Sequence, residues 1–331
     1  MKKFVLFVIM MMSVLTFTAC GGNEEAPAEN TEGGETGQEA ALEGSVIVDG
    51  SGTVYPLMAR IAEEYMVAKQ PDVSVQVGRA GTSAGFKKFI PGETDFSDAS
   101  RAIKEEEIAQ LEEKGMKLGE DVLEIKLAYD GLTFVINKDN DWAKEMTRDE
   151  IVNLFLSGKY NPDDIVKWSD IRPDWPAEEI KFYGPNENHG TYEFFFEEIL
   201  GKQELVKTAN LQQEYSTLVD LVSKEKNAIA FFGFGYYVSN QDKLQAVAVD
   251  FGDGKPVLPS LDTIGENLPY AGFTRPVYTY MNAKLAAEKP EVLDFAKYIT
   301  EAAPQFAGET GFAPLSKEQY DAYLEQLNAI K

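Results

Sequence analysis

The sequence predicts an α/β fold. Beyond Gly44 the chain alternates short β-branched runs with runs of helical apolar period, which is typical of a sheet covered by helices. The chain has 331 residues, 44% of them apolar, enough for two domains with cores of their own. Loops rich in glycine, serine and threonine lead from several of these strands into the helices that follow.

The predicted elements repeat one unit of strand, loop and helix. The first unit is a strand at 45–48, a loop at 49–53 and a helical period at Val54, Leu57, Met58, Ile61 and Tyr65. The second is a strand at 73–77, a loop at 78–83 and a helix through Phe86, Phe89 and Ile90. The third is a strand at 180–183, a loop at 184–190 and a helix at 191–200. A further strand is expected at Phe96, another at 276–280, and the aromatic run 231–237 is interpreted as buried sheet packing.

The three loops share a chemistry that suits a small anion. The first N–H groups of a helix have no intrahelical partner and carry partial positive charge, so an oxyanion is stabilised there. Ordinary N-capping by serine or threonine is the structural alternative for each loop. Arg101, after the strand at Phe96, could offer a bidentate fork to the same anion. Pairing of Arg101 with Asp98 on the surface is the alternative there.

Motifs in these loops resemble those of the phosphate-binding proteins of the Pst ABC transporter. They are DGSGTVYP at 49–56, GTSAGF at 81–86, DFSDASR at 95–101 and GT at 190–191, with further matches in order up to Leu315. The resemblance implies a two-lobed periplasmic-binding-protein fold of type II, each lobe a sheet flanked by helices, with the ligand in the cleft between them. It places lobe one at 45–127 plus 275–331 and lobe two at 128–274.

The resemblance also implies the ligand-binding residues. In the first lobe they are Ser51, Thr53, the backbone N–H of Val54, Thr82, Ser83, Ser100 and Arg101. In the second they are His189, Gly190 and Thr191, with His189 in the place of a family serine. Phosphate keeps a proton at neutral pH, so a binding site that selects it over sulfate requires a hydrogen-bond acceptor for that proton. Asp98 is the first candidate for this acceptor and Asp130 the second.

Charge and composition exclude several classes of function. With 55 acidic and 31 basic residues the net charge is −24, and the basic residues are not clustered as a nucleic-acid site requires. One cysteine and one histidine do not supply a zinc site, a disulfide framework or a separate catalytic dyad. Together with these exclusions, the resemblance to the Pst phosphate-binding proteins implies a monomeric binding protein without cofactor, metal or catalytic residues. Such a protein would capture inorganic phosphate and deliver it to an ABC permease.

Two alternatives stay open at this point. One is a binding protein for another oxyanion. The other is a serine hydrolase, because residues 81–85 match the G-x-S-x-G pattern around Ser83 and the only histidine, His189, comes later in the chain. The histidine of an α/β-hydrolase follows the last strand, whereas 142 residues follow His189. This spacing argues against the hydrolase.

The N-terminus predicts export and a lipid anchor. Two lysines precede an apolar run that is shorter than a spanning helix, and Cys20 lies where a signal peptide would be cut. The segment resembles a bacterial lipoprotein signal at 1–19 with lipidation of Cys20. Residues 20–44, with seven glutamates and no Lys or Arg, predict a flexible tether at the outer face of the cytoplasmic membrane. An ordinary signal peptide with an incidental cysteine is the alternative.

Overall fold

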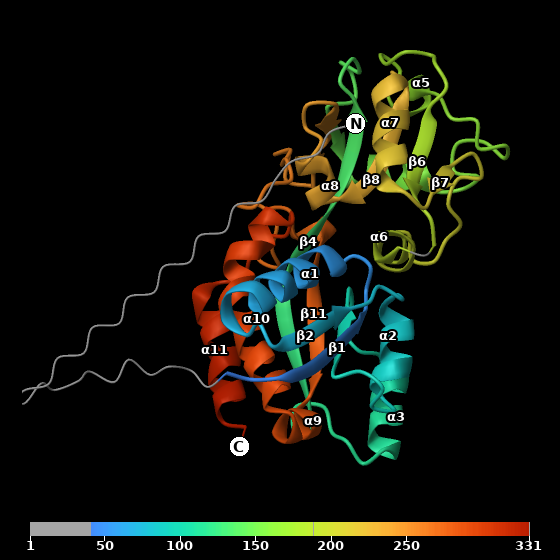
Figure 1. Cartoon of the computed structure of the whole chain (residues 1–331). Coiled ribbons are helices and arrows are strands. Elements are labelled where there is room, and N and C mark those ends of the chain that lie inside the picture. Colours follow the sequence, from blue (N-terminus) through green and yellow to red (C-terminus); the bar gives the residue numbers. More distant parts are fainter. Residues whose placement is uncertain (1–40, 188, 331) are drawn as a thin grey trace, which may run out of the picture. The chain divides into compact units, whose positions relative to one another are not determined.

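The computed structural model describes residues 41–187 and 189–330, and Figure 1 shows their helices and strands in sequence colours. The predicted signal peptide, Cys20 and most of the tether lie outside the described residues. The first elements are β1 (Gly44–Gly50), α1 (Tyr55–Glu64), the π-helical turn η1 (Tyr65–Lys69), β2 (Val73–Val77), α2 (Thr82–Phe89), β3 (Phe96–Ala99), α3 (Glu105–Glu113) and β4 (Val122–Asn137). Next come β5 (Glu145–Thr147), α4 (Arg148–Phe155), α5 (Trp168–Ile171), β6 (Lys181–Pro185), α6 (Gly190–Phe194), the π-helical turn η2 (Phe195–Ile199), β7 (Asn210–Gln212) and α7 (Tyr215–Lys224). The last are β8 (Ala228–Gly233), α8 (Phe234–Val238), β9 (Leu244–Ala246), β10 (Ala248–Asp250), η3 (Ala271–Phe273), β11 (Thr274–Asn282), α9 (Ala283–Glu288), α10 (Pro290–Glu309) and α11 (Lys317–Asn328).

Nine strands of the described chain join in one sheet with the order β2-β1-β3-β11-β4-β8-β6-β7, and β9 pairs with β4. β1 is parallel to β2 and β3, whereas β11 is antiparallel to β3 and β4. We name the part from β2 to β11 half-sheet A and the part from β8 to β7, with β9, half-sheet B. β5 and β10 form a separate pair.

The 16-residue strand β4 belongs to both half-sheets. Its first part pairs with β11 as far as Gly131, and from Leu132 onward it pairs with β8. Nearly every residue of the strand from Leu127 onward is buried, as expected of a strand covered on both faces. The change of partner lies in the region where the sequence predicted a crossing between lobes. The lobe boundaries themselves stay a prediction.

Helices cover both faces of half-sheet A. α10 packs against β1, β4 and α1, and α2 packs against β1 and β3. Figure 1 shows α10 and α11 on one side of these strands and α2 and α3 on the other. Successive strand residues point to opposite faces, so Phe96 joins the large core under α10 while Ala99 joins the smaller core under α2.

The predicted units of strand, loop and helix are confirmed, with small shifts of their ends. The π-helical turns extend α1 and α6, and β11 begins two residues before the expected return strand. The interpretation of the aromatic run 231–237 as buried sheet packing is only partly correct. Phe231 and Phe232 are fully buried in β8, but Gly233 caps α8 and leaves Tyr236 39% exposed. Among the described helices none is apolar over a length that could cross a membrane.

Asp98 is an ionisable group buried within half-sheet A. It lies on β3 between Gly50 of β1 and Thr279 of β11, and it has no exposed surface. Neither of its carboxyl oxygens has a hydrogen-bond partner in the described part of the chain. Burial raises the pKa of Asp98 to about 8, against a smaller lowering by the neighbouring Thr279 hydroxyl and with a further small rise from the negative charge of Asp49. The carboxyl group is therefore mostly protonated at neutral pH.

We predict that Asp98→Asn flattens the pH dependence of stability. The unfolded carboxyl titrates near pH ~3.9, so between about pH 4 and 8 only the folded state binds the proton. The free energy of unfolding should then fall as pH rises, by up to ~1.4 kcal/mol per unit from this one group. Urea unfolding of both proteins at pH 5, 6, 7 and 8 measures the difference. Parallel profiles for the native protein and the variant would contradict the buried protonated state.

Candidate functional site

The first loop connects β1 to α1 and is fixed by Ser51. Its N–H donates to the carbonyl oxygen of Asp98 at 2.8 Å, and its Oγ accepts from the N–H of Thr53 at 3.2 Å. Gly50, at φ +143°, lies so close to β3 that an added Cβ would be 2.1 Å from the Asp98 carbonyl oxygen. These contacts hold the loop against β3, and in this arrangement Val54 caps α1 and its N–H belongs to the helix start.

The second loop is joined to the end of β3 by two hydroxyl groups. Thr82 begins α2, and its Oγ1 lies 3.2 Å from the Oγ of Ser100. The same Oγ1 accepts from the N–H of Ser100 at 3.2 Å, and both residues are buried. Ser83, by contrast, is exposed. The first-turn N–H groups of α2 have no intrahelical partner.

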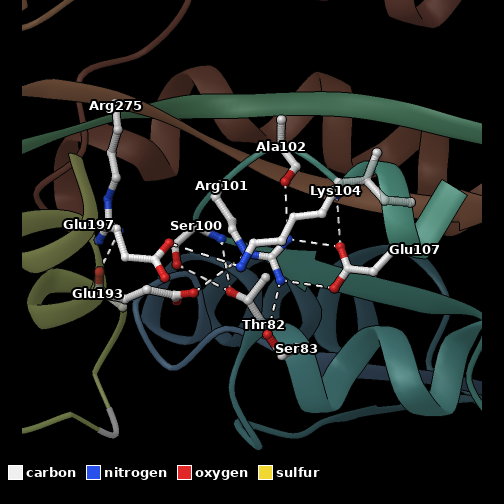
Figure 2. A network of polar contacts seen from close by, with 12 residues as sticks. Thr82, Ser83, Ser100, Arg101, Ala102, Lys104, Glu107, Glu193, Glu197 and Arg275 are labelled. Carbon is white, nitrogen blue, oxygen red and sulfur yellow. Dashed lines mark hydrogen bonds and ion pairs between the residues drawn. The ribbon is translucent and has the colours of Figure 1, made fainter. Parts of the chain in front are cut away.

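Arg101 is already paired in this structure. Its Nη1 and Nη2 donate to the two carboxyl oxygens of Glu107 at 2.8 and 2.9 Å, and Nη2 also donates to Ser83 Oγ at 2.9 Å. Its Nε lies 3.5 Å from Glu193, and Figure 2 shows the guanidinium group among these partners. The pairing with Asp98, which was the alternative for Arg101, does not form. The fork predicted to bind an anion is thus occupied by Glu107, and a direct role of Arg101 on the ligand stays a prediction.

The third loop brings half-sheet B to the first two. His189 caps α6, and an added Cβ on Gly190 would lie 2.4 Å from Ser100 Oγ and 2.9 Å from Thr53 Oγ1. Such distances require that Gly190 have no side chain. The structure therefore brings together Thr53, Ser100 and Gly190, which come from three different loops, as the sequence predicted.

The side chains of His189 and Thr191 are held by aromatic and backbone groups. Burial lowers the pKa of His189, so the ring is neutral, and its Nε2 donates to the carbonyl oxygen of Gln213 at 2.8 Å. The ring lies edge-on to Tyr215 at 4.9 Å between centroids. Tyr215 donates through its hydroxyl to Thr191 Oγ1 at 3.1 Å. Thr191 can therefore still offer a ligand its own O–H, because a hydroxyl that accepts one hydrogen bond keeps its donor, together with its backbone N–H at the start of α6.

Sequence reasoning missed Arg275, the most buried cation of the site. Its Nε and Nη2 donate to Asp130 Oδ2 at 3.1 and 2.9 Å, and Nη1 donates to the carbonyl oxygen of Gly190 at 2.6 Å. Only 6% of the Arg275 side chain and 5% of the Asp130 side chain are exposed. The signal that could have found Arg275 is its place directly before the apolar, aromatic run 276–280. The return strand was predicted to start at Pro276, one residue too late to include it.

Two cavities meet at these loops. The larger, about 970 Å³, is lined by Ser51, Thr82, Ser83 and Gly190, among others. The smaller, about 340 Å³, is lined by Thr53, Asp130, Thr191 and Gly233, among others. Gly52, His189, Tyr215 and Tyr236 line both. Of the two proton-acceptor candidates, Asp130 lines the smaller cavity, whereas Asp98 lines neither.

The geometry does not form a hydrolase dyad. Ser83 Oγ accepts from Arg101, and the Nε2 of His189 is used by Gln213, so no hydrogen bond joins Ser83 to His189 in the described chain. Within residues 41–187 and 189–330, no group of His, Cys, Asp and Glu side chains has the arrangement of a metal site. What the loops do offer is a set of hydroxyl and backbone donors converging from both half-sheets.

Comparison with known proteins identifies one family, and its matches together span the chain. The model of the PBP superfamily domain matches residues 30–303. The phosphate-binding protein PstS of Staphylococcus epidermidis is 37% identical over 329 residues, which cover 99% of this chain and 94% of that protein. The PstS protein of Staphylococcus saprophyticus is also 37% identical, over 100% of this chain and 96% of that protein.

A solved structure agrees with these relatives. It is that of a possible phosphate binding protein from Planctomyces limnophilus, with a TM-score of 0.67 and 34% sequence identity. The match covers 88% of this chain and 100% of that chain. The α/β fold is thus the periplasmic-binding-protein fold that the sequence predicted, and the chain belongs to the PBP superfamily and, within it, to the family of PstS phosphate-binding proteins.

Proposed function

We propose that this protein captures inorganic phosphate in the cleft between its half-sheets and delivers it to the permease of an ABC transporter. The observation that carries the proposal is the convergence of Thr53, next to the start of α1, and Gly190, at the start of α6, on Ser100 at the end of β3. The names of the relatives, phosphate-binding protein PstS, support the same ligand. Delivery rather than conversion of phosphate is part of the proposal, and the relatives' names, which describe phosphate-binding proteins, support it.

The binding groups act locally, since the whole molecule repels anions. The net charge is −24, and the larger cavity is lined by Arg79 and Lys87 but also by Glu187, Glu193, Glu197 and Glu214. A phosphate dianion therefore gains its affinity from short-range donors. Hydrogen bonds to a charged group are worth about 1.5–3 kcal/mol each. Several of them reach a Kd of ~1 μM or tighter after the cost of ordering the loops.

Binding would close two lobes on the ligand. We assign residues 45–127 plus 275–331 to one lobe and 128–274 to the other, because β4 changes its partner from β11 to β8 at Gly131 and Leu132. The ligand would be held by Ser51, Thr53, Val54, Thr82, Ser83 and Ser100 of the first lobe and by Gly190 and Thr191 of the second. The protein acts as a monomer and needs no cofactor for this.

We predict that the whole chain, in detergent, gives a calorimetric binding signal with phosphate and a weaker one or none with sulfate, molybdate and acetate. Phosphate fits best because Asp130, at the edge of the smaller cavity, is the acceptor that only a protonated oxyanion can use. Absence of heat with phosphate would sink the proposal, and tighter binding of molybdate or sulfate would favour another oxyanion. Release of p-nitrophenol from an ester, lost in Ser83→Ala, would favour the hydrolase.

The lipid anchor is a separate proposal. Cys20 follows a short apolar run, and residues 20–44 carry seven glutamates and no Lys or Arg, the composition of a flexible tether. We propose that a lipid on Cys20 holds the folded part at the outer face of the cytoplasmic membrane.

Replacing the predicted lipid acceptor tests this anchor. Cys20→Ser should move the protein from the membrane fraction to the soluble fraction of a bacterial host and abolish incorporation of labelled palmitate. Phosphate affinity should not change, because the cleft lies far along the chain from Cys20. Equal membrane association of the two proteins would contradict the anchor and support an ordinary signal peptide.

A further inference from the structure

We propose that Arg275, fixed by Asp130, is a positioning residue that holds the Gly190 loop against the Thr53 loop and so sets how completely the cleft closes. The inference rests on the proposed function, because closure is assigned a role in holding phosphate. The inference goes beyond the proposed function because it assigns the buried Arg275 to the peptide backbone of the site instead of to the ligand.

The first observation is that the sheet itself fixes the guanidinium group. Arg275 and Asp130 are directly paired residues of β11 and β4. Nε and Nη2 both donate to Asp130 Oδ2, and the ring of Phe194 lies 5.0 Å from the guanidinium carbon. The head group of Arg275 is thus held by two strands and covered by an aromatic ring, so it has little freedom to follow a ligand.

The second observation is that the same group contacts both loops. Nη1 donates to the Gly190 carbonyl oxygen at 2.6 Å, and Nη2 lies 3.4 Å from Thr53 Oγ1. Gly190 follows β6 of half-sheet B, and Thr53 follows β1 of half-sheet A. A planar fork can serve a carboxylate and two further acceptors together, which the compact ammonium of lysine cannot do in the same geometry.

The peptide between Gly190 and Thr191 connects Arg275 to the ligand-facing donor. In a trans peptide the carbonyl and the N–H point in opposite directions. A cation on the Gly190 oxygen therefore directs the Thr191 N–H away from Arg275 and polarises it into a stronger donor. Because Asp130 neutralises the guanidinium group, Arg275 acts through this peptide rather than as a free charge beside the anion.

Loss of the fork should then reduce the closed population. The apparent Kd rises in proportion as the binding-competent fraction falls. We expect Arg275→Lys to weaken phosphate binding at least ~10-fold. The weaker binding should come from faster dissociation, because the open cleft still admits the ligand.

The test measures closure directly by energy transfer between two dyes on the whole chain. The exposed residues Glu112 of α3 and Glu198 of η2 become the labelled cysteines, and Cys20→Ser removes the natural one. Arg172→Lys is the matched control. Arg172 also forms a bidentate pair, with Glu150 at 2.8 Å, and its guanidinium group lies over the ring of Trp175, away from the loops of the site. Gly190→Ala is the reference for blocked closure, since its Cβ would collide with Ser100.

With saturating phosphate the native protein and Arg172→Lys should reach the same short distance. Arg275→Lys and Gly190→Ala should keep a longer one and release phosphate faster. Native closure by Arg275→Lys would overturn the inference, whether its affinity is normal or reduced. Normal closure by Gly190→Ala would also overturn it, and this holds even if the lysine variant does not fold. If the native protein itself does not bind phosphate, the proposed function fails. A longer unliganded distance in Arg275→Lys would still support the role of Arg275 in holding the Gly190 loop against the Thr53 loop.

Discussion

The ion pair between Asp130 and Arg275 is the interaction on which the site depends. Its two residues lie opposite each other on β4 and β11, directly before the point where β4 changes its partner from β11 to β8. Burying two charges costs several kcal/mol per ion, and only good geometry with further hydrogen bonds offsets it. Here the carbonyl oxygen of Gly190 and the hydroxyl of Thr53 provide those further partners. The cost of burial thus connects the centre of the sheet to both loops of the cleft.

The same arrangement explains how an acidic protein can bind an anion. Two arginines at the loops are neutralised, Arg275 by Asp130 and Arg101 by Glu107, while Arg79 lines the larger cavity among several glutamates. The loops offer a ligand mainly hydroxyl groups and backbone N–H groups at helix starts, whose partial charges act over a short range. Such donors lie in loops that are held by the ends of the strands before them, which lowers the cost of ordering these loops when the ligand binds.

Much of the fold could be predicted from the sequence because the signals were local. The units at 45–65 and 73–90 have clear strand and helix periods, and the glycines at 50 and 81 lie where the backbone needs positive φ. Convergence of Thr53, Ser100 and Gly190 followed from the motifs at their loops. The pairing of Arg101 could not be predicted, because Glu107 is one of several carboxylates on the same stretch of chain. Arg275 and Asp130 are 145 residues apart, and only the register of β11 on β4 brings them together.

The central claim is that backbone and hydroxyl donors from both half-sheets surround the ligand while Arg275 stays on Asp130. A crystal structure of the protein grown with phosphate tests it most directly. The account predicts a phosphate ion within hydrogen-bond distance of Ser100 Oγ and the N–H groups of Val54 and Thr191, with the Arg275 to Asp130 pair intact. A phosphate ion bound by the Arg275 fork, with Asp130 displaced, would contradict it.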